Sequence, residues 1–152
     1  MKINVYQEPN LKENHIDLYY NQMDEETMAI KQYLSALEGM IPGKDEETER
    51  ERMMTPGEIL YIEVVERKTY AYLKDSVWRI TYGLQQFMDK FGSVGFARNS
   101  KSMLVNIYHI QELNAQMNMR VNIVMDNGER IVLNRSYKNE FYKYLEKKVT
   151  ES

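Results

Sequence analysis

The sequence contains no cysteine among its 152 residues. This absence excludes a disulfide framework, a thiolate nucleophile and a cysteine-ligated metal site. The two histidines, His15 and His109, lie far apart and outside any metal-ligand motif, so we predict neither a metal nor a cofactor. The motifs G-x-x-x-x-G-K-[ST], G-x-S-x-G and H-E-x-x-H are also missing, and we therefore predict that the protein is not an enzyme.

Long hydrophobic runs are missing as well. No stretch has the length needed to span a bilayer, and the first residues lack the apolar core and cleavage site of a secretory signal. Together with the lack of cysteine, these features predict a cytoplasmic location. Apolar residues still make up 43% of the chain, which is enough for one core, or for one domain with a smaller appended unit.

Positive charge is scarce in the first third of the chain. Residues 1–55 carry six Lys/Arg against twelve Asp/Glu, whereas residues 56–152 carry fourteen against eleven. The acidic run Asp45-Glu46-Glu47 lacks the ligand spacing of an EF-hand loop, so we interpret it as a solvated charge run. Because contacts to phosphate need local positive charge, only the C-terminal part is suited to nucleic acid.

The N-terminal pattern predicts a small strand–strand–helix unit. Apolar residues alternate in 2–8 and again in 15–22, which is typical of strands. Asp24 is suited to cap a helix that ends near Gly39. Residues 40–57 are rich in charge and flanked by Pro-Gly pairs, and they indicate a linker or a frayed helix. We therefore predict an extension and linker over residues 1–57.

The pattern changes from Glu58 onward and predicts a β-rich α+β domain over residues 58–152. Residues 59–65, 69–73 and 77–80 indicate an antiparallel meander, and residues 84–91 a short helix. Asn127-Gly128, between the alternating runs 119–125 and 129–133, is a strong hairpin signal. The other expected elements are short strands at Phe96 and Leu104-Val105 and a last helix capped by Ser136.

Four segments then resemble one family in its order: 59–63, 84–91, 96–106 and 127–137. The third, Phe96-Ala97-Arg98-Asn99-Ser100-Lys101-Ser102-Met103-Leu104-Val105-Asn106, is the most specific. The resemblance is to the LytTR domain, the DNA-binding domain of bacterial response regulators of the LytR/AlgR/AgrA type, and it covers about residues 58–148. It implies elongated antiparallel β-sheets with short helices, whose loops enter successive major grooves.

The resemblance also implies which residues contact DNA. The family's contacting loops fall here on Arg67, Lys68, Thr69, Arg98, Asn99, Lys101, Ser102, Arg135 and Lys138. We expect Lys101 and Arg135 to read base edges, and the other cations to hold phosphates. Arg98 is equally suited to a structural role. Asn106 could contact DNA but is better suited to closing a turn, and Asn134 replaces the serine more common before the last arginine.

The whole chain resembles stand-alone LytTR regulators that have a short N-terminal extension and no receiver domain. We therefore predict a sequence-specific transcription regulator that binds double-stranded DNA as a homodimer or as two copies side by side. The N-terminal unit would mediate self-association or receive a signal, and a membrane protein is a candidate regulatory partner. The alternative is a protein-interaction module of the same fold that binds such a partner without binding DNA.

Overall fold

The computed structural model describes residues 1–12 and 14–151, without the side chains of residues 35–38 and 151. The chain divides into two compact units, Met1–Ser35 and Ala36–Ser152. In the described residues, no helix has both the length and the apolar character needed to cross a membrane.

The N-terminal unit contains most of helix α1 (Glu25–Glu38), preceded by extended chain. Asp24 caps this helix as expected, because its Oδ1 accepts a hydrogen bond of 2.7 Å from the Thr27 backbone N–H. The prediction of two strands before the helix is wrong, since the described residues of 1–24 include no strand. Ile3 and Val5 are 82% and 89% exposed. Alternation is present there, but without sheet pairing and burial it does not make a strand.

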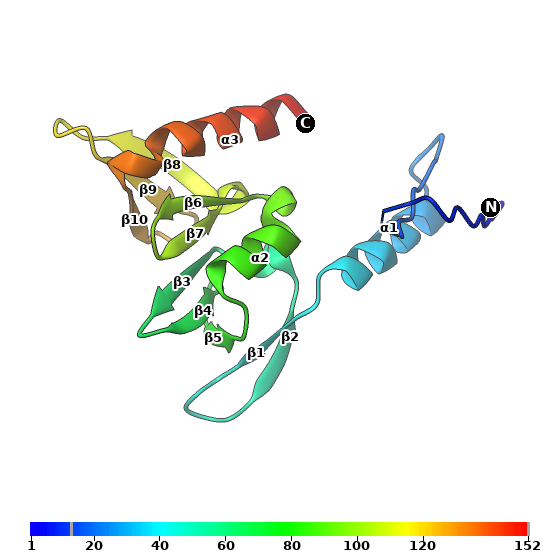
Figure 1. Cartoon of the computed structure of the whole chain (residues 1–152), viewed down its shortest axis with the longest axis horizontal. Coiled ribbons are helices and arrows are strands. Elements are labelled where there is room, and N and C mark those ends of the chain that lie inside the picture. Colours follow the sequence, from blue (N-terminus) through cyan, green and yellow to red (C-terminus); the bar gives the residue numbers. More distant parts are fainter. Residues whose placement is uncertain (13, 152) are drawn as a thin grey trace. The chain divides into compact units, whose positions relative to one another are not determined.

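The C-terminal unit is built from two antiparallel sheets (Figure 1). The larger has the strand order β2-β1-β5-β4-β3-β7-β6, and the smaller has the order β10-β9-β8. The large-sheet strands are β1 (Ile41–Lys44), β2 (Glu51–Met54), β3 (Tyr61–Val65), β4 (Lys68–Tyr72), β5 (Val77–Ile80), β6 (Phe96–Ser100) and β7 (Met103–Asn106). The small-sheet strands are β8 (Ile110–Ala115), β9 (Val121–Met125) and β10 (Arg130–Leu133).

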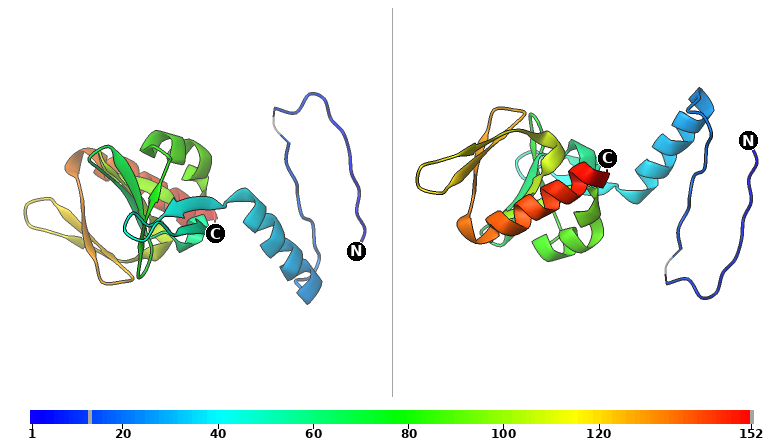
Figure 2. Two further views of the ribbon diagram at one scale, coloured as in Figure 1. Left: turned by 90° about the horizontal axis from the view of Figure 1, so that it is seen from below. Right: turned by 90° about the horizontal axis from the view of Figure 1, so that it is seen from above.

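Side-chain alternation along the central strands fills two cores. Ile62 of β3 and Leu104 of β7 face the first core, which is covered by α2 (Leu84–Phe91). Their neighbours Tyr61 and Val105 face the second core, between the two sheets and under α3 (Lys138–Glu151). Figure 2 shows the two helices in two further views. The β-rich fold with short helices agrees with the expected fold class.

The expected linker over residues 40–57 is wrong. The β1–β2 hairpin occupies most of it and joins the large sheet where Lys44 pairs with Arg79 of β5. Ile41 and Met54 are fully buried in the first core, so the two ends of this charged stretch are anchored by apolar side chains. The C-terminal unit therefore includes residues ahead of position 58.

The remaining elements largely follow the sequence pattern. Helix α2 has the expected bounds, and β9 and β10 form the expected hairpin around Asn127-Gly128. Strand β8 was not expected. The last helix begins at Lys138, after a 3-10 turn, η4 (Arg135–Tyr137), rather than directly after a Ser136 cap.

Candidate functional site

Two turns of the large sheet lie at the same end. Glu66 and Arg67 connect β3 to β4, and Lys101 and Ser102 connect β6 to β7. Because β3 pairs antiparallel with β7, the end of one strand lies beside the start of the other. The Val64 backbone N–H donates a 2.9 Å hydrogen bond to the Ser102 carbonyl, which links the two turns directly.

A third connection joins them from the small sheet. The Asn134 backbone N–H donates to the Asn99 carbonyl at 2.9 Å. The Asn99 side-chain Nδ2 in turn donates to the Val132 carbonyl at 3.1 Å. These bonds hold the end of β10, and with it Arg135 in η4, beside the end of β6. Lys101 and Arg135 therefore project from neighbouring connections, as a shared contact surface requires.

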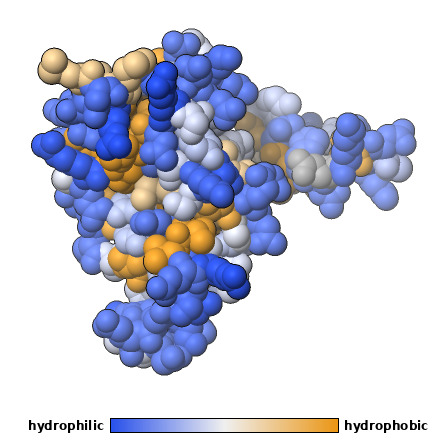
Figure 3. Space-filling model, turned by 60° about the vertical axis from the view of Figure 1, so that its left-hand side comes forward, coloured by the Kyte–Doolittle hydropathy of each residue, from blue (hydrophilic) through white to orange (hydrophobic). Residues whose placement is uncertain are grey.

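We call these three connections, residues 66–67, 101–102 and 135–137, the loop edge. They lie on one side of the C-terminal unit, on the left in Figure 1. Figure 3 brings that side forward and shows a largely hydrophilic surface with hydrophobic patches between the polar residues. Two exposed apolar residues lie next to the loop edge. Val65, which is 42% exposed, precedes Glu66 in the sequence, and Val132, which is 40% exposed, lines the same hollow as Arg135.

Most of the cations at or directly next to the loop edge have no carboxylate partner. Within the described part of the chain, Arg67, Lys101, Arg135 and Lys138 take part in no ion pair. Lys68 differs, because its Nζ lies 3.8 Å from Glu46 Oε1 in the β1–β2 connection. A cation without a carboxylate partner keeps its charge available for a phosphate or a base edge.

The ion pair between Glu46 and Arg79 was not predicted from the sequence. Glu46 Oε1 lies 3.2 Å from Arg79 Nη1 and accepts a 3.2 Å hydrogen bond from the Tyr70 hydroxyl. Arg79 could have been found, because it occupies an outward position in the alternating strand 77–80. Glu46 could not, because nothing in the acidic run indicates a hairpin that folds back onto β4 and β5.

For two of the expected contact residues, burial shows that the predicted contact is wrong. Thr69 is 6% exposed and Asn99 is 1% exposed, so neither side chain is available to an external partner. Thr69 follows the exposed Lys68 in the alternation of β4 and lies on the buried face of the sheet. Asn99 lies at a bulge, where the β6–β7 register shifts between Arg98 and Ser100, and its amide bonds to β10. Asn99 thus positions the loop edge and is not part of its surface.

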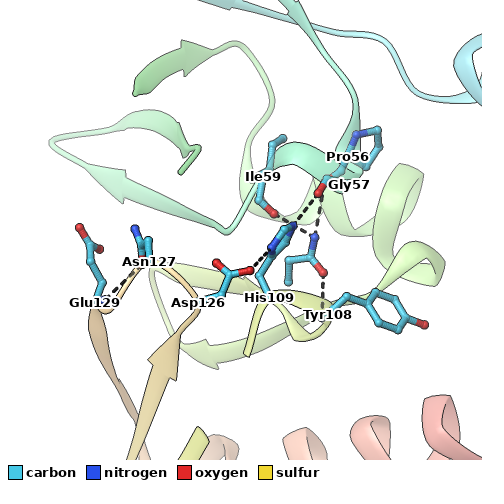
Figure 4. A network of polar contacts seen from close by, with 9 residues as sticks. Pro56, Gly57, Ile59, Tyr108, His109, Asp126, Asn127 and Glu129 are labelled. Atoms are coloured by element: carbon cyan, nitrogen blue, oxygen red, sulfur yellow. Dashed lines mark hydrogen bonds and ion pairs between the residues drawn. The ribbon is translucent and has the colours of Figure 1, made fainter. Parts of the chain in front are cut away.

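Arg98 is partly exposed and has a structural contact. Its Nη1 donates to the Lys101 carbonyl at 3.5 Å, across the bulge. Asn106 is structural, as its turn chemistry suggested. It is 2% exposed, donates from Nδ2 to the Ile59 carbonyl at 2.9 Å and accepts the Tyr108 backbone N–H at 3.1 Å. Figure 4 shows this network together with His109.

The chain is similar to known proteins over this unit. A family model described as the LytTr DNA-binding domain matches residues 49–146. The sensory transduction protein LytT of Enterococcus faecalis is 26% identical over 89 residues, which are 59% of this chain and 37% of that protein. A solved LytTr DNA-binding domain from Bacillus cereus has a TM-score of 0.65 and 26% identity, covering 70% of this chain and 96% of that one.

Proposed function

Because the chain belongs to the LytTR family of DNA-binding domains, we propose that it is a sequence-specific transcription regulator whose loop edge enters the grooves of duplex DNA. One observation carries this proposal. Lys101 and Arg135, from connections far apart in the sequence, lie on neighbouring loops, and neither is neutralised by a carboxylate among the described residues. The same family resemblance supports a cytoplasmic protein.

The roles divide by chemistry. Arg135 carries a planar fork that suits the O6 and N7 atoms of guanine, and Lys101 offers a point contact to a base edge or phosphate. Arg67, Lys68 and Lys138 hold phosphates and fix the register of the domain on the duplex. Arg98 supports the β6–β7 turn through its bond to the Lys101 carbonyl. Val65 and Val132 are suited to thymine methyl groups.

The N-terminal unit serves self-association in this proposal, so that two copies occupy two repeats of a site. Its described residues expose several large apolar side chains, including Tyr6 and Tyr19 at 80% and 89%. Such residues are costly to leave in water and are typical of contact surfaces. A membrane protein that senses a signal is a second candidate partner for the same residues.

Arg135→Ala tests the proposed role of Arg135. The wild-type protein first selects its target from a pool of genomic fragments, and mobility-shift titrations then compare that target with single-base variants and unrelated DNA. Loss of a bidentate base contact should cost about 1–3 kcal/mol and relax discrimination at one base pair. Arg130→Ala, an exposed arginine of β10 outside the loop edge, is the matched control.

Two results would count against the proposal. If Arg135→Ala keeps both affinity and discrimination, Arg135 does not read a base. If the wild-type protein shifts no duplex with steep salt dependence, the alternative of a protein-interaction module is favoured instead.

A further inference from the structure

The connection between β8 and β9 forms a hydrogen-bonded tip that lies outside the loop edge. The Gln116 backbone N–H donates to the Arg120 carbonyl at 2.7 Å, and the Arg120 N–H donates to Asn118 Oδ1 at 3.2 Å. Met117 is fully exposed at the tip. Figure 2 shows this connection projecting from the C-terminal unit. Hydrogen bonds within the tip thus fix the direction in which Arg120 leaves the backbone.

A hollow of about 770 Å³ lies between this tip and the start of the last helix. Arg120, Asn118 and Met119 line it from the tip, and Arg135, Ser136 and Asn139 line it from the other side. All residues of the lining are described, and none of them is an aspartate or glutamate. Two arginines and several residues with amide or hydroxyl groups therefore line one open space, and its lining includes no carboxylate.

This chemistry suits an oxyanion such as a phosphate. Guanidinium groups bind phosphate through paired, charge-assisted hydrogen bonds, and amide and hydroxyl groups supply the remaining donors. Because the hollow includes Arg135, a ligand inside it would lie next to the proposed base-reading side chain. The exposed apolar surface of Met119 at its rim, 58% exposed, is suited to the sugar that follows a phosphate.

We infer that the hollow binds a phosphodiester of the DNA backbone, with Arg120 as its second cation. This inference rests on the proposed function and extends the contact surface from the loop edge to the β8–β9 tip. Arg120 then positions the domain without reading sequence, whereas Arg135 spans the hollow and the neighbouring groove.

Arg120→Gln in the full chain tests the inference. Association constants for the selected duplex are measured between 50 and 200 mM NaCl. Loss of one phosphate contact should make the slope of log K against log salt shallower by about 0.9, so the deficit of the variant shrinks about threefold across this range. The ratio of specific to non-specific affinity should stay the same, because a backbone contact carries no sequence information.

Two further variants and one probe complete the design. Arg120→Lys keeps the charge and should keep the slope. Arg130→Gln removes an equal charge from β10 outside the hollow and should leave the slope unchanged. Thermal unfolding of each variant checks that the exposed substitution leaves the fold intact. Inorganic phosphate is titrated separately, with the arginine Nε–H signals followed by NMR.

The outcomes separate cleanly. A shallower slope for Arg120→Gln alone supports the inference. An unchanged slope, or an equal loss with Arg130→Gln, overturns it while the proposed function stands. Saturable binding of inorganic phosphate that depends on Arg120, together with an unchanged DNA slope, also overturns it and makes the hollow a site for a free anion. A wild-type protein that binds no duplex overturns the proposed function and this inference together.

Discussion

His109 joins three segments that are distant in sequence. Its Nδ1 lies 2.7 Å from Asp126 Oδ2, and its Nε2 lies 2.6 Å from the Gly57 carbonyl (Figure 4). Both partners are acceptors, so only the protonated ring, with two N–H donors, satisfies both contacts. Partial burial lowers the pKa of His109, but the hydrogen bonds to Gly57 and Asp126 outweigh it, and the net pKa is raised.

A raised folded-state pKa makes a prediction about stability. The stabilisation by His109 should be fully present below its unfolded pKa of about 6.5 and should disappear as pH rises through the higher folded pKa. We expect the free energy of unfolding of wild type, minus that of His109→Gln, to decline between pH 5.5 and 8.5. Urea titrations measure this difference, with His15→Gln as the control. A difference that stays constant with pH would contradict the linkage.

Burial separates the contact residues that could be predicted from the sequence from those that were predicted wrongly. Lys101 and Arg135 were recognisable from their place in a family pattern, and their charge agrees with an exposed position. Asn99 carries the same pattern but is buried, and its amide donates to the Val132 carbonyl of β10. This contact depends on the smaller sheet lying beside β6, so local sequence does not reveal it.

At the scale of elements, the β3–β4 turn has an unusual backbone. Glu66 and Arg67 have φ values of 51° and 69°, in the left-handed region that favours glycine and asparagine. Each non-glycine residue costs about 1–2 kcal/mol there. Strain of this kind is often kept where a side chain has a function, and Arg67 is the side chain that this turn presents.

Replacing the two turn residues should separate stability from binding. Glu66→Asn alone should stabilise the fold modestly and should not weaken DNA binding, because Arg67 remains and a negative charge is removed from the loop edge. Glu66→Asn with Arg67→Gly should stabilise it further, by roughly 1–2 kcal/mol relative to wild type, and weaken DNA binding. Urea unfolding and salt-dependent titrations measure the two effects. A double variant that binds DNA as tightly as Glu66→Asn does would remove Arg67 from the contact surface.

The elements that the sequence predicted best are those with a complete local signal. Helix α2 has an apolar stripe and a following glycine, and the β9–β10 hairpin has Asn127-Gly128. Strand β8 was missed because its own residues are largely polar and half-exposed, and its stability comes from pairing with β9. The β1–β2 hairpin was missed for a related reason, since buried Ile41 and Met54 lie at the ends of a charged stretch.

At the scale of the whole molecule, the two units differ in charge and in the presence of a hydrophobic core. Residues 1–35 carry three Lys/Arg against six Asp/Glu, whereas the C-terminal unit contains both cores. An acidic segment with exposed apolar residues is poorly suited to DNA and well suited to another protein surface. The division predicts that residues 36–152 fold without the N-terminal unit and keep the DNA-binding surface.

The fragment of residues 36–152 therefore provides the last prediction. It should unfold in one cooperative transition, sediment as a monomer, and bind a single repeat about as tightly as the full chain does. On a duplex with two repeats we expect cooperative binding from the full chain but not from the fragment, because we propose that self-association takes place through the N-terminal unit. Sedimentation velocity and quantitative footprinting measure the two properties. A fragment that still dimerises and binds cooperatively would move the self-association surface into the C-terminal unit.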